Sequence, residues 1–99
     1  MFTVLSRFDE EPEDISIGLG QTARFGCSAQ GIPPPAVSWF KDDRPLALDR
    51  SRMTVLPSGS LEISDIQPSD EGVYRCNVSN VDRSAASSSG RLVLNNSPG

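Results

Sequence analysis

The sequence predicts an all-β sandwich of two sheets, and three observations carry this prediction. Short runs with apolar residues at every second position recur along the chain, and turn residues interrupt them about every 8 to 12 residues. No stretch has the apolar periodicity of a helix. The length of 99 residues suits one domain with an adequate core.

Each expected strand has its own alternation, bounded by its own turn. Gly18 and Gly20 separate the first two runs, and the segment from Gly31 through three prolines forbids regular pairing before the third. A turn at Pro57–Gly59 separates the fourth run from the fifth. We therefore expect roughly six to eight short strands, with alternating runs at 15–17, 23–27, 37–40, 53–55, 61–63, 73–78 and 90–94.

The stretch "DEGVYRC" at 70–76 reads as a turn that leads into a buried strand. The turn at 67–72 has a proline, polar residues and a glycine. Spacing by two then places Tyr74, Cys76 and Val78 on one mainly apolar face. The other face of this strand carries Val73, Arg75, Asn77 and Ser79.

The two cysteines, Cys27 and Cys76, have two interpretations. Each lies on the apolar face of a run that the other can face, so they can form a disulfide; alternatively they are two inert buried thiols, which is the usual state inside a cell. A bond would close a loop of about 50 residues and contribute roughly 4 kcal/mol in the chain-entropy model. It would also imply an oxidising compartment.

The combined spacing of these residues resembles an immunoglobulin domain. Cys27 precedes Trp39 by eleven intervening residues, Leu61 and Ile63 alternate, and the pattern D-x-G-x-Y-x-C ends at Cys76. The "G-x-P-x-P" before the tryptophan and "W-F-K-D" from it onward resemble the I-set. The match runs from about residue 15 to 94.

The resemblance implies a two-sheet Greek-key sandwich with one inter-sheet disulfide, Cys27–Cys76, beside a buried Trp39. It also implies that Leu61 and Tyr74 belong to the core, with the Tyr74 hydroxyl bonded to backbone a few residues upstream as a tyrosine corner. In many such domains an arginine that opens a strand pairs with the aspartate of the turn. Here that pair would be Arg52 and Asp70; alternatively, Asp70 only caps its own turn.

The segment "VLPSG" at 55–59, followed by Leu61, Ile63 and Ser64, is similar to the immunoglobulin domains of the DCC/neogenin/protogenin receptors. That resemblance implies an extracellular module of a single-pass cell-membrane protein, with roles in protein recognition, ectodomain spacing, cell adhesion and axon guidance. Its partners would be other cell-surface or secreted proteins, including neighbouring immunoglobulin domains. The alternative is an I-set domain of an intracellular muscle or cytoskeletal protein with reduced cysteines.

The expected organisation has three parts. Residues 1–8 form a leading segment or first strand, 9–94 the I-set domain, and 95–99 a linker. An acidic cluster opens the domain, at Asp9, Glu10, Glu11, Glu13 and Asp14. These acids suggest either a calcium site toward a neighbouring domain or a solvated segment, and we favour the latter because their spacing matches no calcium loop.

An enzyme is not expected, because the chain has no histidine and hence no histidine-based catalytic or metal site. No cofactor is expected either. The net charge is −4, but without the five acids at 9–14 nine basic residues face eight acidic ones. Nucleic-acid binding therefore has no electrostatic support.

The candidate binding face is the outward side of the strands at 37–40, 73–78 and 90–94. Phe40 should point outward next to Arg75 and across from Val93, and Arg91 should lie on the adjacent strand, with Lys41 close by. A glycosaminoglycan or acidic partner would suit the basic residues. A solvated polar face explains the same residues, and we favour it.

Two N-glycosylation sequons are present, at Asn77-Val-Ser and Asn95-Asn-Ser. Asn77 is the expected site, because its strand position points outward. A glycan there should exclude a protein contact on the same face.

Overall fold

The computed structural model describes residues 4–32, 34–81 and 84–95. Residues 1–3 of the expected leading segment and 96–99 of the expected linker lie outside the described residues. The elements, in chain order, are β1 (Val4–Glu10), β2 (Ile15–Ile17), β3 (Ala23–Phe25), β4 (Ser28–Ile32), β5 (Ala36–Lys41), β6 (Arg44–Pro45), β7 (Met53–Val55), β8 (Leu61–Ile63), the 3-10 helix η1 (Pro68–Asp70), β9 (Gly72–Ser79), β10 (Ser84–Ala86) and β11 (Gly90–Leu94).

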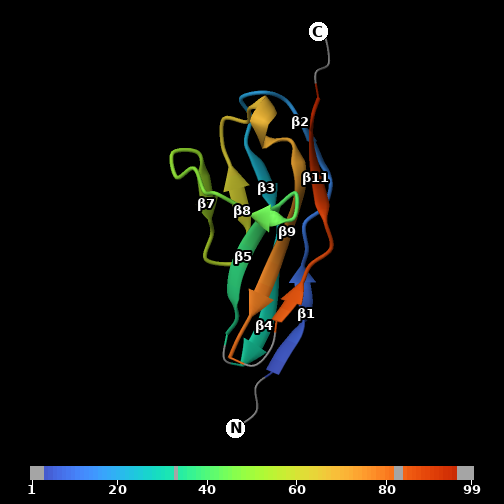
Figure 1. Ribbon diagram of the computed structural model, residues 1–99, viewed down its shortest axis with the longest axis vertical. Helices are drawn as coiled ribbons and strands as arrows, with labels where there is room; N and C mark the ends of the chain where they lie inside the picture. Colours follow the sequence, from blue (N-terminus) through green and yellow to red (C-terminus); the bar gives the residue numbers. More distant parts are fainter. Residues whose placement is uncertain (1–3, 33, 82–83, 96–99) are drawn as a thin grey trace.

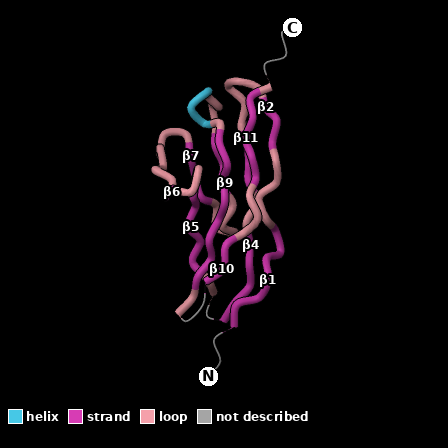
Figure 2. Tube along the Cα trace, turned by 45° about the vertical axis from the view of Figure 1, so that its right-hand side comes forward, coloured by secondary structure: helices cyan, strands magenta, loops and turns pink. Residues whose placement is uncertain are grey.

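The strands form the two layers of a sandwich (Figures 1 and 2). One layer is a six-stranded sheet in the order β2-β11-β9-β5-β6, with β10 also paired to β9. The other contains β3-β8-β7, and the β1-β4 pair continues it because only Gly26 and Cys27 separate β3 from β4. The expected all-β sandwich is confirmed. None of the described segments forms a helix long and apolar enough to span a bilayer.

All seven runs that alternate in the sequence contain strands, but the described residues hold eleven strands rather than six to eight. Part of the excess comes from strands outside those runs, such as β10. After β10, the Ser87 hydroxyl accepts the Cys76 N–H at 3.0 Å and the Ser87 N–H donates to the Cys76 carbonyl. A side chain therefore replaces a backbone carbonyl in the ladder, and β10 and β11 are separate strands.

The expectation that the segment from Gly31 cannot pair is wrong at its start. Gly31 lies in β4 and its Cα is the partner of Leu5 in β1. Gly31 precedes the prolines and keeps its own backbone N–H, so only the prolines lose the ability to donate. The pairing of β1 with β4 supports a first strand, one of the two expectations for residues 1–8.

A disulfide between Cys27 and Cys76 joins the two layers, with the two Cα atoms 6.5 Å apart. Both cysteines are fully buried, and the same core contains the fully buried Leu61 and Tyr74. This confirms the disulfide interpretation over two free thiols. The loop that it closes stabilises the fold by roughly 4 kcal/mol in the chain-entropy model.

Trp39 packs beside this disulfide, because the pairing of β5 with β9 sets it opposite Cys76. Its indole Nε1–H donates to the Gly59 carbonyl at 2.8 Å, so the buried ring satisfies its polar atom. Gly59 has φ of 104°, and a Cβ there would lie 2.8 Å from Val37 Cγ2. Glycine at position 59 therefore lets the turn approach Val37 closely enough for the Gly59 carbonyl to accept the indole N–H.

Tyr74 connects the core to the turn that precedes β9. Its ring stacks on Phe25 with centroids 4.7 Å apart, and its hydroxyl donates to the Asp70 carbonyl at 2.6 Å. Burial raises the pKa of the hydroxyl, with a further contribution from the nearby carboxylate of Asp70. This is the tyrosine corner that the resemblance implies.

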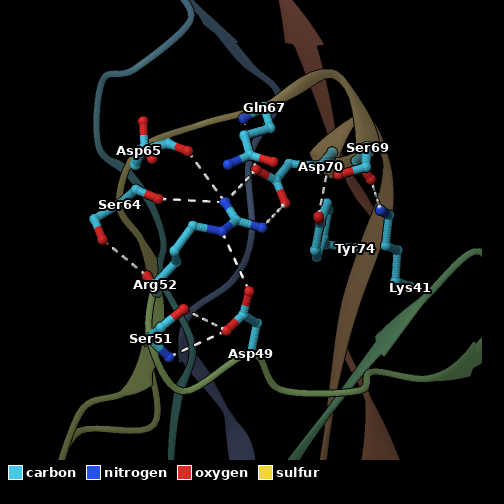
Figure 3. Close-up of polar contacts among 10 residues, drawn as sticks. All are labelled: Lys41, Asp49, Ser51, Arg52, Ser64, Asp65, Gln67, Ser69, Asp70 and Tyr74. Atoms are coloured by element: carbon cyan, nitrogen blue, oxygen red, sulfur yellow. Dashed lines mark hydrogen bonds and ion pairs between the residues drawn. The ribbon is translucent and has the colours of Figure 1, made fainter.

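The carboxylate of Asp70 is the centre of a polar cluster at this end of the sandwich (Figure 3). Asp70 is only 1% exposed. The Arg52 guanidinium donates to it through both terminal nitrogens, Nη1 at 2.7 Å and Nη2 at 3.1 Å, and the Gln67 N–H donates at 2.8 Å. Arg52 also donates to the Asp65 carbonyl at 3.1 Å. The two residues named as a pair from the sequence thus lie in contact, and Asp70 caps its own turn as well.

The charge of Asp70 is retained despite its burial. Burial acts to raise the pKa of the carboxyl group, but the hydrogen bonds and charge of Arg52, together with the Gln67 N–H, outweigh burial and lower the pKa below its usual value. The same ion pair raises the pKa of Arg52. The pair is therefore charged at neutral pH, and removal of one partner leaves the other buried without compensation.

We predict that Asp70→Ala and Arg52→Ala each destabilise the domain by about 3–5 kcal/mol, the cost of breaking a buried pair. The coupling energy from a double-mutant cycle, measured by denaturant unfolding, should exceed about 1 kcal/mol. Asp49→Ala serves as the control, because the Asp49 side chain is half exposed and contacts the Arg52 side chain only at Nε, at 3.4 Å. A coupling near zero would mean that Asp70 acts only as the local cap of its turn.

Candidate interaction surface

The outward face of the six-stranded sheet is built by β5, β9 and β11. Alternation along β9 gives the expected division, since Tyr74, Cys76 and Val78 are buried and the residues between them are half-buried. The pairing with β5 and β11 then fixes which side chains share the outward face. They are Ala36, Ser38, Phe40, Val73, Arg75, Asn77, Ser79, Arg91 and Val93.

Phe40 and Arg75 lie at the centre of this face as a contacting pair. Their Cα atoms are cross-strand partners, and the Arg75 guanidinium carbon lies 5.9 Å from the centroid of the Phe40 ring. Arg75 Nη1 also contacts Asp43 Oδ1 at 3.0 Å. The guanidinium is therefore held over an aromatic ring by a carboxylate, an arrangement that limits its conformational freedom.

The carboxylate that holds Arg75 belongs to the two-residue turn between β5 and β6. Asp42 and Asp43 have φ of 51° and 65°, a left-handed conformation that aspartate tolerates better than most residues. The Asp42 side chain accepts the Val73 N–H at 3.0 Å, and its own N–H donates to the Val73 carbonyl. Both aspartates thus tie the turn to β9.

Two positions expected on this face differ in the structure. Arg91 is opposite Val73 and Leu92 is opposite Gly72, so Val93 lies beyond the end of β9 and not across from Phe40. Between β10 and β11, three residues at 87–89 face only two on β9, at 75–76, so the register shifts by one residue, and alternation alone cannot reveal such a shift.

Lys41 is the second correction, because it lies on the inner side of β5. Its Nζ is 5.7 Å from the centroid of the Tyr74 ring and donates to the Ser69 carbonyl. Lys41 follows Trp39 by two residues, so strand parity gives both the same side. The basic residues on the outward face are therefore Arg75 and Arg91 without Lys41.

Two carboxylates of the acidic segment at 9–14 accept backbone N–H groups from the other end of the chain. Glu11 Oε1 accepts the Ser88 N–H at 2.8 Å, and Asp14 Oδ1 accepts the Arg91 N–H at 2.9 Å. Among the described residues no three histidine, cysteine or acidic side chains gather as a metal site would require. Sequence reasoning missed this role, because the donors belong to β11 and the segment before it, about 77 residues further along the chain.

The outward face carries charges of both signs. Arg91 and Val93 line a pocket at its end together with Asp42 and Glu71, and Arg75 is paired with Asp43. Glu71 is also engaged, because Oε2 accepts the Leu94 N–H at 2.8 Å. The surface offers apolar area and paired charge, which differ from the uniform positive charge that a polyanion would need.

Comparison with known proteins agrees with this architecture. The family model described as the immunoglobulin I-set domain matches residues 6–92. Mouse hemicentin-2 is 46% identical over 68 residues, covering 69% of this chain and 1% of hemicentin-2. The mouse netrin receptor DCC is 44% identical over 77 residues, covering 75% of this chain and 5% of DCC. The resemblance to DCC expected from the sequence is confirmed, and hemicentin-2 shares a similar degree of identity.

Solved structures show the same fold. Extracellular domains 3–5 of Drosophila OTK superpose with a TM-score of 0.83 and 32% identity, covering 94% of this chain and 32% of that chain. The complex of titin M10 with an immunoglobulin domain of obscurin-like 1 gives a TM-score of 0.82 and 27% identity, covering 94% of this chain and 96% of that chain. The chain belongs to the immunoglobulin I-set family.

Proposed function

We propose that this chain is an extracellular recognition and spacing module of a multidomain cell-surface receptor or adhesion protein. The observation that carries the proposal is the outward face of β5, β9 and β11, where Arg75 is held over the Phe40 ring by Asp43. Aromatic residues and arginine are enriched at protein interfaces, and a side chain that is already ordered loses less entropy on binding.

The compartment is inferred from the disulfide. Cys27–Cys76 is buried between the layers, and disulfides of this kind persist in oxidising environments. The relatives include a protein named as a netrin receptor and a structure of extracellular domains. These similarities favour a place in the ectodomain of a single-pass membrane protein with roles in adhesion or axon guidance.

The spacing role follows from the shape of the domain. The described chain begins at one pole and leaves at the other, and the long axis is 57 Å against 23 and 20 Å for the others (Figure 1). A domain of this form sets its neighbours apart along one line. Neighbouring immunoglobulin domains and secreted or cell-surface proteins are the partners we propose, and the pairing of Arg75 with Asp43 argues against a glycosaminoglycan.

The likeness to a chain of the titin M10–obscurin-like 1 complex favours one alternative, a module of an intracellular muscle or cytoskeletal protein with reduced cysteines. Alkylation of the natively isolated protein without reductant, followed by mass measurement, separates the two. We expect Cys27 and Cys76 to take up no label, because they are bonded to each other, and to take it up after reduction and unfolding. Labelling of both cysteines in unfolded, non-reduced protein would support the intracellular class.

We predict that Phe40→Ser combined with Arg75→Glu in the full ectodomain weakens its contacts by at least tenfold, about 1.4 kcal/mol. The readouts are self-association by sedimentation and binding of recombinant netrin. Arg24→Glu is the matched control, since Arg24 is an exposed arginine of β3 in the other sheet. If neither readout changes while the thermal midpoint holds, the outward face is a solvated surface and not a contact site.

A further inference from the structure

The surroundings of Asn77 differ sharply from the rest of the outward face. Asn77 is half-buried on β9, with Ser38 as its partner on β5 and Ala86 as its partner on β10. The next outward position, Ser79, is flanked by Ala36 and Ser84. All five outward neighbours on this side of Asn77 are therefore alanine or serine, and cross-strand neighbours lie only about 5 Å away.

On the other side of Asn77, the outward side chains are much larger. Two residues along β9, roughly 7 Å away at the rise of a strand, Arg75 lies over the Phe40 ring and contacts Asp43. Large, mutually braced side chains thus follow a row of small ones. We call the five small residues the platform, and the Phe40–Arg75–Asp43 group the ridge.

We infer that Asn77 carries an N-linked glycan that lies over the platform, with the ridge separating it from the Val73, Arg91 and Val93 end of the face. Asn77-Val78-Ser79 is a sequon with an outward asparagine. The platform gives a bulky sugar room without displacing any large side chain. This inference rests on the proposed function, because N-glycosylation requires passage through the secretory route.

The same geometry removes the expected exclusion between a glycan and a protein contact. Alanine and serine are depleted at interfaces, whereas the ridge and the residues beyond it have interface-like composition. Val73 is four residues from Asn77 along β9, roughly 14 Å by the rise of a strand. One half of the face is thus suited to a sugar and the other half to a partner.

The test uses the full ectodomain secreted from animal cells. Enzymatic release of N-glycans in heavy-oxygen water leaves a mass mark on each asparagine that carried a glycan. We expect this mark at Asn77. Ser79→Ala should abolish it, while Ser79→Thr, which keeps the hydroxyl of the sequon, should retain it. Absence of the mark with Cys27 and Cys76 still bonded would overturn this inference alone. Absence of both the mark and the bond would count against the proposed function too.

The placement of the glycan is tested by hydroxyl-radical footprinting. An Ala86→Met variant provides an oxidisable side chain on the platform, and Val93, 42% exposed, reports on the far end. Relative to the same variant with Ser79→Ala, the introduced methionine should be oxidised several-fold more slowly in the glycosylated protein, with Val93 unchanged. Equal oxidation of the methionine, or protection of Val93 as well, would show that the glycan does not lie over the platform alone.

Discussion

A buried carboxylate, that of Asp70, constrains one whole end of this sandwich. A charged group that is 1% exposed must be matched by donors, and Arg52 and the Gln67 N–H supply them. Arg52 directly precedes β7, and Asp70 ends η1 just before β9. The ion pair therefore joins the edge of one layer to the entry of the central strand of the other, and the Tyr74 hydroxyl reinforces the same junction.

The position of β9 in turn decides the outward face. Once Tyr74 and Cys76 are fixed inward, Arg75 and Asn77 must point outward, because side chains alternate along a strand. The turn at Asp42–Asp43 is bonded to Val73 and Arg75, so it adds a second restraint on the same strand. A contact in the core thus determines which residues of β9 face outward.

The sequence predicts those parts of the structure that depend on alternation and on large buried side chains. Cys27, Trp39 and Cys76 could be assigned because each lies in an alternating run and their spacing resembles that of an immunoglobulin domain. Cross-strand register could not be derived, since the hydroxyl of Ser87 interrupts a ladder without any change in apolar pattern. Lys41 was expected close to the outward arginines, but it shares the inner side of β5 with Trp39 and its Nζ lies by the ring of Tyr74.

The pKa of Asp70, measured by carboxyl-carbon NMR titration of the folded domain, tests the central claim most directly. If the Arg52 pair outweighs burial, the pKa lies below the unperturbed value of about 3.9. The stability from this group is then fully present above that value and is lost as the pH falls through the folded pKa. Acid unfolding should therefore be shallower in Asp70→Asn. A pKa at or above the unperturbed value would contradict the account.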